Sequence, residues 1–249
     1  MQTIKEVTLA LKTATQYEPW MEAISQDERA GVQKAWQQFL KRLDKQIQVQ
    51  RAHDEKIAFD AKFGRLVAGV DEAGRGPLAG PVVTAAVILP EDCQELVGLN
   101  DSKQLSKEAR ERMSVLVKEY ALSYSIHFQS AQVIDAINIY EATKQSMVSS
   151  VETLSVKPDF VIVDAMTLPI HLPQQSIIKG DAKSLAIAAA SILAKTARDA
   201  YMEKLDQEFP MYGFAQHAGY GTKQHILALE QFGPTIHHRK SFEPIKSMV

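Results

Sequence analysis

Four acidic residues stand where a buried strand ends or a helix begins. They are Asp71 and Glu72 after the apolar residues 66–70, Asp164 after residues 161–163, and Asp181 after Lys179 and Gly180. Adjacent carboxylates are costly to bury, because each resists desolvation and repels the others. Neighbouring strands lie about 4.8 Å apart, so the four acids can meet at one rim of a sheet. With two Mg²⁺ ions about 3.5–4 Å apart, such a rim is typical of in-line phosphodiester hydrolysis.

Each acid also has a purely structural interpretation. Asp181 is placed to cap the helix that follows it, and Asp164 is placed to form a turn after its strand. Successive strand residues point to opposite faces, so Asp71 and Glu72 reach one site only if their strand ends or bulges there. The four acids together favour metal binding over these alternatives.

The segment Gly74-Arg75-Gly76 directly follows the first two acids. Glycines let the backbone approach a large ligand, and Arg75 can donate to phosphate or sugar oxygens. The segment therefore predicts a nucleic-acid contact beside the metal ligands. The alternative is an ordinary turn with solvated charges.

Composition excludes several classes of protein. The 249 residues carry a formal net charge of −2, so the chain is not a basic nucleic-acid coat, and binding needs a local patch or bridging metals. The single cysteine, Cys93, excludes an intrachain disulfide and fits a reducing compartment. No signal peptide is apparent, and the longest apolar run, Leu185–Ala194, is too short to span a bilayer. We expect a cytoplasmic protein with no membrane association, and we interpret His237-His238 as a solvated surface pair.

The residue pattern changes near residue 63, from helix-like before it to a mixture of strand and helix patterns after it. This change predicts a helical N-terminal extension over 1–62 and a catalytic domain with a helical and basic tail over 63–249. In the extension, apolar residues recur at spacings of three and four: Val32, Trp36, Phe39, Leu43 and Ile47. Basic residues on the other faces leave two interpretations open. One is an arm that touches a phosphate backbone, and the other is an amphipathic helix that packs its apolar stripe on the main domain. Interleaved acidic residues favour the second.

The remainder has an α/β pattern. Predicted strands cover residues 66–70, 82–89, 122–128, 160–163 and 176–178, and predicted helices cover 107–119, 132–154, 182–205 and 222–231. The turn at residues 71–80 favours antiparallel pairing of the first two strands, while the later strands alternate with helices. The pattern predicts a mixed β-sheet flanked by helices.

Five segments occur in the order seen in one family. They are Asp71-Glu72-Ala73-Gly74-Arg75-Gly76, Asn100-Asp101-Ser102-Lys103, Val163-Asp164-Ala165, Lys179-Gly180-Asp181-Ala182-Lys183-Ser184 and His217-Ala218-Gly219-Tyr220-Gly221-Thr222. In these segments the chain resembles bacterial ribonuclease HII, in the Gram-positive form with an N-terminal extension. The resemblance covers roughly Arg65 to Phe242.

The resemblance implies a ribonuclease H-like fold in a monomer. It implies that Asp71, Glu72, Asp164 and Asp181 are catalytic acids that bind two Mg²⁺ or Mn²⁺ ions. The implied partners are RNA/DNA hybrids, whose RNA strand is cut, and duplex DNA incised 5′ of a single ribonucleotide. Both reactions would leave 3′-hydroxyl and 5′-phosphate ends.

The resemblance also assigns substrate contacts. Gly74-Arg75-Gly76 would read the 2′-hydroxyl, the only group that distinguishes the two sugars, and Tyr220 would stack on the next deoxyribose. Without the resemblance, Tyr220 is more typical of a loop residue packed on the core. Lys103 would lie near the active site, with a salt bridge to a carboxylate as the alternative. Ser184 and Ser102 would contact phosphates or cap helices.

Two alternatives compete with this interpretation, and only the first belongs to another functional class. One is a hybrid-binding module without chemistry, and the other is a type HIII-like enzyme that acts only on hybrid tracts. Type HIII enzymes usually show Gly-Lys-Gly where this chain has Gly74-Arg75-Gly76, and all four acids are present. The sequence therefore favours the type HII endonuclease.

Overall fold

The computed structural model describes residues 2–100, 102 and 104–249. It divides the chain into two compact units that meet between Asp54 and Glu55, inside the long helix α3 (Ala30–Asp60). The boundary near residue 63 stays a prediction, and each unit is described by itself below.

The N-terminal unit buries its own apolar stripe. It contains α1 (Ile4–Thr13), α2 (Met21–Ser25) and the first part of α3. Val32, Trp36 and Phe39 are buried against Val7 and Leu11 of α1. The expectation that this stripe packs on the main domain was therefore wrong, because two short helices of the same unit supply the apolar partner.

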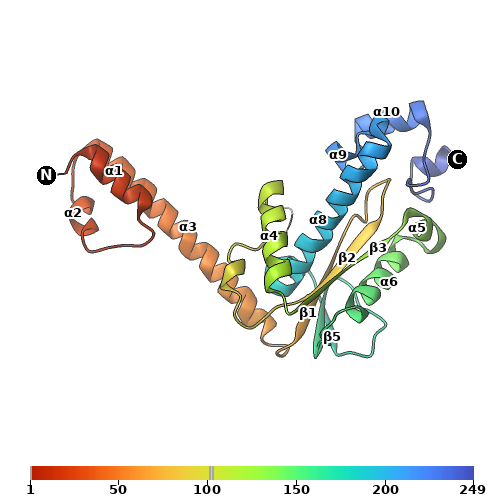
Figure 1. Cartoon of the computed structure of the whole chain (residues 1–249), viewed down its shortest axis with the longest axis horizontal. Helices are drawn as coiled ribbons and strands as arrows, with labels where there is room; N and C mark the ends of the chain where they lie inside the picture. Colours follow the sequence, from red (N-terminus) through yellow and green to blue (C-terminus); the bar gives the residue numbers. More distant parts are fainter. Residues whose placement is uncertain (1, 101, 103) are drawn as a thin grey trace. The chain divides into compact units, whose positions relative to one another are not determined.

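The second unit is built on a five-stranded mixed sheet. The strands are β1 (Val67–Ala73), β2 (Val82–Ile88), β3 (Ser123–Gln129), β4 (Phe160–Asp164) and β5 (Gln174–Ile177). Their order across the sheet is β3-β2-β1-β4-β5. β1 pairs with β2 in the antiparallel direction and with β4 in the parallel direction, which confirms the predicted mixed sheet (Figure 1).

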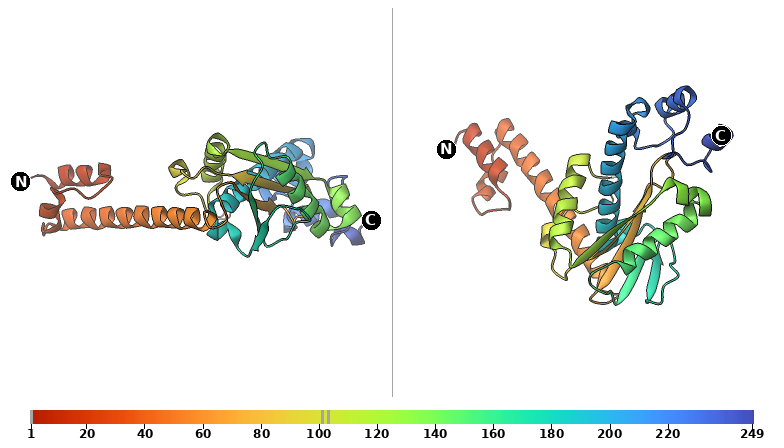
Figure 2. Two further views of the ribbon diagram at one scale, coloured as in Figure 1. Left: turned by 90° about the horizontal axis from the view of Figure 1, so that it is seen from below. Right: turned by 45° about the vertical axis from the view of Figure 1, so that its right-hand side comes forward.

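Helices cover both faces of this sheet (Figure 2). Besides the end of α3, the α-helices of this unit are α4 (Lys107–Tyr120), α5 (Ala131–Ile137), α6 (Ile139–Glu152), α7 (Gly180–Lys183), α8 (Leu185–Glu208), α9 (Phe214–His217) and α10 (Lys223–Phe232). Alternate residues of β2 separate the two cores. Ala85 and Val87 pack with the apolar residues of α8, and Ala86 and Ile88 pack with Met147 of α6. None of the described helices is long and apolar enough to cross a membrane.

Two of the predicted helices are each divided in two. The helix expected over 132–154 is interrupted at Asn138, which has φ 70° and whose side chain accepts from the N–H groups of Tyr140 and Glu141. The helix expected over 182–205 restarts at Ser184, whose hydroxyl accepts from the N–H of Ile187 at 3.0 Å. In both places, a polar side chain competes with the helical backbone for hydrogen bonds and starts a new helix.

Gly69 sets how closely α8 approaches the sheet. A β-carbon on Gly69 would lie 2.2 Å from the carbonyl carbon of Ala186 and 2.3 Å from the nitrogen of Ile187. These are backbone atoms at the start of α8, so no side-chain rotation can relieve the clash. The absence of a side chain at position 69 therefore allows α8 to pack directly on β1.

We expect Gly69→Ala to destabilise the protein by about 3 kcal/mol or more, because one extra carbon must displace a helix in a close-packed core. Urea unfolding of the full chain measures the change in free energy. Ser176→Ala, at an exposed position of β5, is the matched control and should change stability by no more than about 0.5 kcal/mol. Equal stability of Gly69→Ala and the control would contradict the packing described here.

Candidate active site

Three of the predicted acids lie at one end of neighbouring strands. Asp71 and Asp164 are the residues that follow the last pair of the parallel β1–β4 ladder. Asp181 lies on α7, shortly after β5, which pairs in parallel with β4. The Oδ1 atom of Asp164 accepts a hydrogen bond of 2.7 Å from the N–H of Gly180. The sheet thus brings Asp71, Asp164 and the segment of Asp181 to the same rim.

Glu72 is placed differently from the expectation. The β1–β2 ladder continues without a bulge through Ala73, which pairs with Val83, so the expected strand end at residue 71 was wrong. Strand alternation places Asp71 on the face covered by α8 and Glu72 on the opposite face. The Oε1 atom of Glu72 lies 3.5 Å from Nη1 of Arg75. The metal-binding role of Glu72 stays a prediction.

Asp71 sits in an environment that disfavours its charge. Its side chain is buried, and burial together with the charges of Glu72 and Asp164 raises its pKa well above the usual range. Hydrogen bonds from the Ser191 hydroxyl and from the N–H of Glu72 (2.7 Å) act in the opposite direction. Ser191 is itself 3.1 Å from the hydroxyl of Ser102. A cation near Asp71 would therefore be favourable.

The carboxylate groups at this rim have the chemistry to bind a divalent cation. Carboxylate oxygens are the ligands that Mg²⁺ and Mn²⁺ prefer, and the charges of two further carboxylates, Glu72 and Asp164, act on Asp71. Among the described residues, no three or more His, Cys, Asp or Glu side chains are gathered so that they could hold an ion. Like charges repel, which is the physical reason for carboxylates to stay apart without a cation. Ion binding would have to draw them together.

The last turns of α3 support the segment that carries Asp181. The buried ammonium of Lys56 donates to the carbonyl oxygen of Asp181 at 3.2 Å and to Oδ1 of Asn100 at 3.1 Å. One turn later, Oδ2 of Asp60 accepts from the N–H of Ala186 at 2.9 Å. Sequence analysis missed both residues, because it assigned them to the N-terminal extension.

The predicted substrate-reading residues lie side by side. A β-carbon on Gly76 would be 3.7 Å from Cε1 of Tyr220, so the tyrosine ring lies next to the Gly74-Arg75-Gly76 segment. The carbonyl oxygen of Gly219 accepts from the N–H of Leu78 at 2.8 Å, which joins the two loops. Tyr220 is 47% exposed and does not pack in the core.

Arg198 of α8 joins these loops from inside the protein. It is buried and donates to the carbonyl oxygens of Pro81 (3.0 Å), Ala218 (2.9 Å) and Ala79 (3.0 Å). It also fills the space behind Gly74, where a β-carbon would lie 2.0 Å from its Nε. Gly74 has φ 89°, a second reason for glycine at this position. Nothing in the sequence distinguishes Arg198 from the other charged residues of this long helix, so its role could not be predicted.

Two histidines support the backbone of Tyr220. The Nδ1 atom of His238 accepts from the N–H of Thr235 at 2.9 Å, so its Nε2 carries the proton and donates to Nε2 of His225 at 3.0 Å. The Nδ1–H of His225 then donates to the carbonyl oxygen of Tyr220 at 3.0 Å. His238 is 1% exposed, so the expected solvated pair His237-His238 was wrong for this residue.

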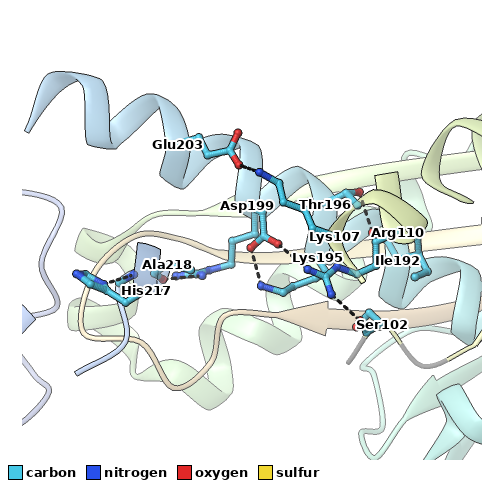
Figure 3. A network of polar contacts seen from close by, with 12 residues as sticks. Ser102, Lys107, Arg110, Ile192, Lys195, Thr196, Asp199, Glu203, His217 and Ala218 are labelled. Carbon is cyan, nitrogen blue, oxygen red and sulfur yellow. Dashed lines mark hydrogen bonds and ion pairs between the residues drawn. The ribbon is translucent and has the colours of Figure 1, made fainter. Parts of the chain in front are cut away.

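Polar contacts tie the neighbourhood of Ser102 to α8 (Figure 3). Arg110 donates to the carbonyl oxygen of Ser102 at 3.0 Å, and its Nη2 lies 3.7 Å from Oδ2 of Asp199. Asp199 also pairs with Lys195 at 2.6 Å. These charges are satisfied within the protein, so Lys195 in this structure is an ion-pair residue of α8.

Two predicted substrate contacts remain. Ser184 is fully buried and caps α8 through its hydroxyl, so its contact with phosphate stays a prediction. Lys103, like Asp101, lies outside the described residues.

Comparisons with known proteins place the chain in one family. The family model described as Ribonuclease HII matches residues 68–244, and the model described as Ribonuclease HII N-terminal domain matches residues 3–64. A protein named Ribonuclease HII from Halalkalibacterium halodurans is 50% identical over 250 residues, which cover 98% of this chain and 95% of the relative. Another of that name, from Enterococcus faecalis, is 49% identical over 256 residues, which cover 100% and 98%.

A solved structure agrees with these relatives. The ribonuclease H2 from Pyrococcus horikoshii aligns with a TM-score of 0.65 and 29% identity, covering 73% of this chain and 96% of that one. The resemblance drawn from the five sequence segments is confirmed, and so is the fold.

The histidines predict how stability depends on pH. Burial, followed by the charges of His225 and His237, lowers the pKa of His238 to about 3, and burial lowers that of His225 to about 4. The unfolded chain has histidine pKa values near 6.5, so between about pH 4 and 6.5 it binds more protons than the folded chain. The contribution of these groups is therefore complete above pH 6.5 and is lost as the pH falls toward 4.

We expect the change in melting temperature from pH 7 to pH 5 to be about 3 °C more favourable in His238→Gln than in wild type, because the substitution removes one group that destabilises the folded chain at the lower pH. Thermal unfolding at the two pH values measures both changes. His171→Gln, at an exposed loop position, is the control and should retain the wild-type dependence. An identical change in melting temperature in His238→Gln and wild type would contradict this assignment.

Proposed function

We propose that this chain, which belongs to the ribonuclease HII family, incises duplex DNA on the 5′ side of a single embedded ribonucleotide. As a member of that family it is a metal-dependent endoribonuclease that acts on RNA/DNA hybrids. One observation carries the proposed incision at a single ribonucleotide. The Gly74-Arg75-Gly76 segment directly follows β1, the strand that carries Asp71, and the exposed ring of Tyr220 lies beside this segment.

We assign the binding of Mg²⁺ or Mn²⁺, two ions in the reacting complex, to Asp71, Glu72, Asp164 and Asp181. Bound ions supply an activated water and stabilise the leaving 3′ oxygen, which leaves 3′-hydroxyl and 5′-phosphate ends. The charges of Glu72 and Asp164 that act on buried Asp71 support the assignment, because a cation would offset their repulsion.

The protein's own residues distinguish the substrate. The glycine backbone allows a close approach to a sugar, where the 2′-hydroxyl is the only difference between ribose and deoxyribose. Arg75, exposed at the loop, can donate to a phosphate oxygen beside it. Tyr220 offers its exposed ring as a stacking surface for the next nucleotide. The proposed partners are therefore RNA/DNA hybrids and ribonucleotide-containing duplexes, bound by one copy of the chain.

We expect the wild-type protein to cut an end-labelled duplex with one internal ribonucleotide immediately 5′ of that nucleotide when Mg²⁺ or Mn²⁺ is present. Asp71→Asn should lower the rate by about 100-fold or more, because a metal ligand loses its charge. Asp159→Asn, the same change at the exposed opposite end of β4, should leave the rate unchanged. Gel analysis of the labelled products measures all three.

The controls are an all-DNA duplex and EDTA, neither of which should give product. Cleavage of long RNA/DNA hybrids without incision at the single ribonucleotide would favour the type HIII-like alternative. Binding without cleavage of either substrate would favour the non-catalytic module. Normal turnover by Asp71→Asn would contradict the metal assignment.

We expect Tyr220→Ala to lower incision at the single ribonucleotide by about 10-fold, which corresponds to the loss of one stacking contact. Cleavage of a uniform RNA/DNA hybrid should fall less, because it offers no ribose–deoxyribose junction. Tyr220→Phe keeps the ring and should behave as wild type. Equal losses on both substrates would show that Tyr220 does not read the junction.

A further inference from the structure

Arg239 lies beneath the Gly74-Arg75-Gly76 loop and is fully buried. Its Nη2 donates to the carbonyl oxygen of Gly74 at 2.6 Å, and its Nη1 donates to that of Arg75 at 2.8 Å. Its Nε and Nη2 also donate to the carbonyl oxygen of Gly80, at 3.1 and 2.9 Å. One guanidinium therefore contacts both ends of the turn between β1 and β2.

These contacts hold a charge that has no acidic partner. In the described part of the chain, Arg239 forms no ion pair with a carboxylate. Burial and the nearby charge of Arg198 lower its pKa to about 9, which leaves it protonated at neutral pH. A buried charge is costly unless hydrogen bonds compensate it. The loop carbonyls, together with the ring of Phe242 at 5.1 Å, provide that compensation, so the arginine and the loop stabilise each other.

The contacts with Arg239 also set the direction in which the N–H groups of the loop point. In a trans peptide the C=O and N–H groups point in opposite directions. Because the carbonyl groups of Gly74 and Arg75 point inward to Arg239, the N–H groups of Arg75 and Gly76 point away from it. Among the described residues, neither N–H has a hydrogen-bond acceptor. The loop thus presents two unused donors on its outer side, where the ring of Tyr220 lies against Gly76.

We propose that Arg239 is a positioning residue for ribonucleotide recognition, which fixes the Gly74-Arg75-Gly76 backbone so that its N–H groups meet the 2′-hydroxyl. This inference rests on the proposed function and assigns a role to a residue outside the loop itself. The planar guanidinium reaches three carbonyl groups at once, whereas a lysine ammonium is a single point charge on a flexible stem. Arg239→Lys keeps the charge and removes this fixed geometry.

The test compares wild type, Arg239→Lys and Ser241→Ala in the full-length protein. Ser241→Ala removes the hydroxyl hydrogen bond to Asp135 in the same segment and leaves the guanidinium in place. For each protein, the Kd is measured in EDTA, which prevents cleavage, for the single-ribonucleotide duplex and for an all-DNA duplex of the same sequence, which differ in one 2′-hydroxyl. Hydrogen–deuterium exchange is measured at the N–H groups of Leu78 and Gly80, which bond to Gly219 and His237 in the wild type.

We expect Arg239→Lys to lower the preference for the single-ribonucleotide duplex, given by the ratio of the two Kd values, by about 10-fold, the effect of losing one well-oriented contact to the sugar hydroxyl. Exchange at Leu78 and Gly80 should become faster, and Ser241→Ala should match wild type in both measurements. An equal loss of affinity for both duplexes, which leaves the ratio unchanged, would overturn the proposal, because a merely structural arginine would not alter the preference for the hydroxyl.

The exchange measurement separates this inference from the proposed function. If the wild-type protein does not incise the single-ribonucleotide duplex, the proposed function fails. Faster exchange of the loop in Arg239→Lys would then still support Arg239 as the residue that fixes the loop, and unchanged exchange would overturn that role.

Discussion

The repulsion between carboxylates at the end of β1 and β4 is the constraint around which the rest of the site is organised. The parallel register of these strands makes Asp71 and Asp164 neighbours, and burial against α8 removes Asp71 from the water that would screen its charge. The fold keeps this unfavourable arrangement because both strands are fixed by a core on each face of the sheet. The electrostatic cost falls on these carboxylates, and a bound cation would lower it.

The surface that would read the substrate is supported by charged and polar groups inside the protein. Two loops far apart in the sequence, 74–80 and 217–222, are held together by carbonyl contacts to Arg198, while His225 holds the backbone of Tyr220. Side chains that donate to carbonyl groups fix a loop without taking up its N–H groups. Among the described residues, this leaves the N–H groups of Arg75 and Gly76 available to a ligand.

The sequence predicted the parts of this site that repeat a local pattern. Alternating and apolar runs located the strands, and the acids after them indicated the rim where they meet. Sequence analysis failed where contacts with distant segments determine whether a residue is buried and what it binds. Nothing local distinguishes Arg198 or His238 from solvated residues, because their partners come from other parts of the chain. The strand end expected at Asp71 was wrong for the same reason, since pairing with β2 extends β1 to Ala73.

The contacts made by the end of α3 determine where a separate catalytic fragment of this enzyme could begin. The two family models separate near residue 64, yet Lys56 and Asp60 are in contact with the segment of Asp181 and the start of α8. A catalytic fragment that begins at residue 63 would leave the main chain of Asp181 without its lysine. The compact unit that contains the sheet therefore begins within α3, at Glu55, and the last turns of that helix belong to it.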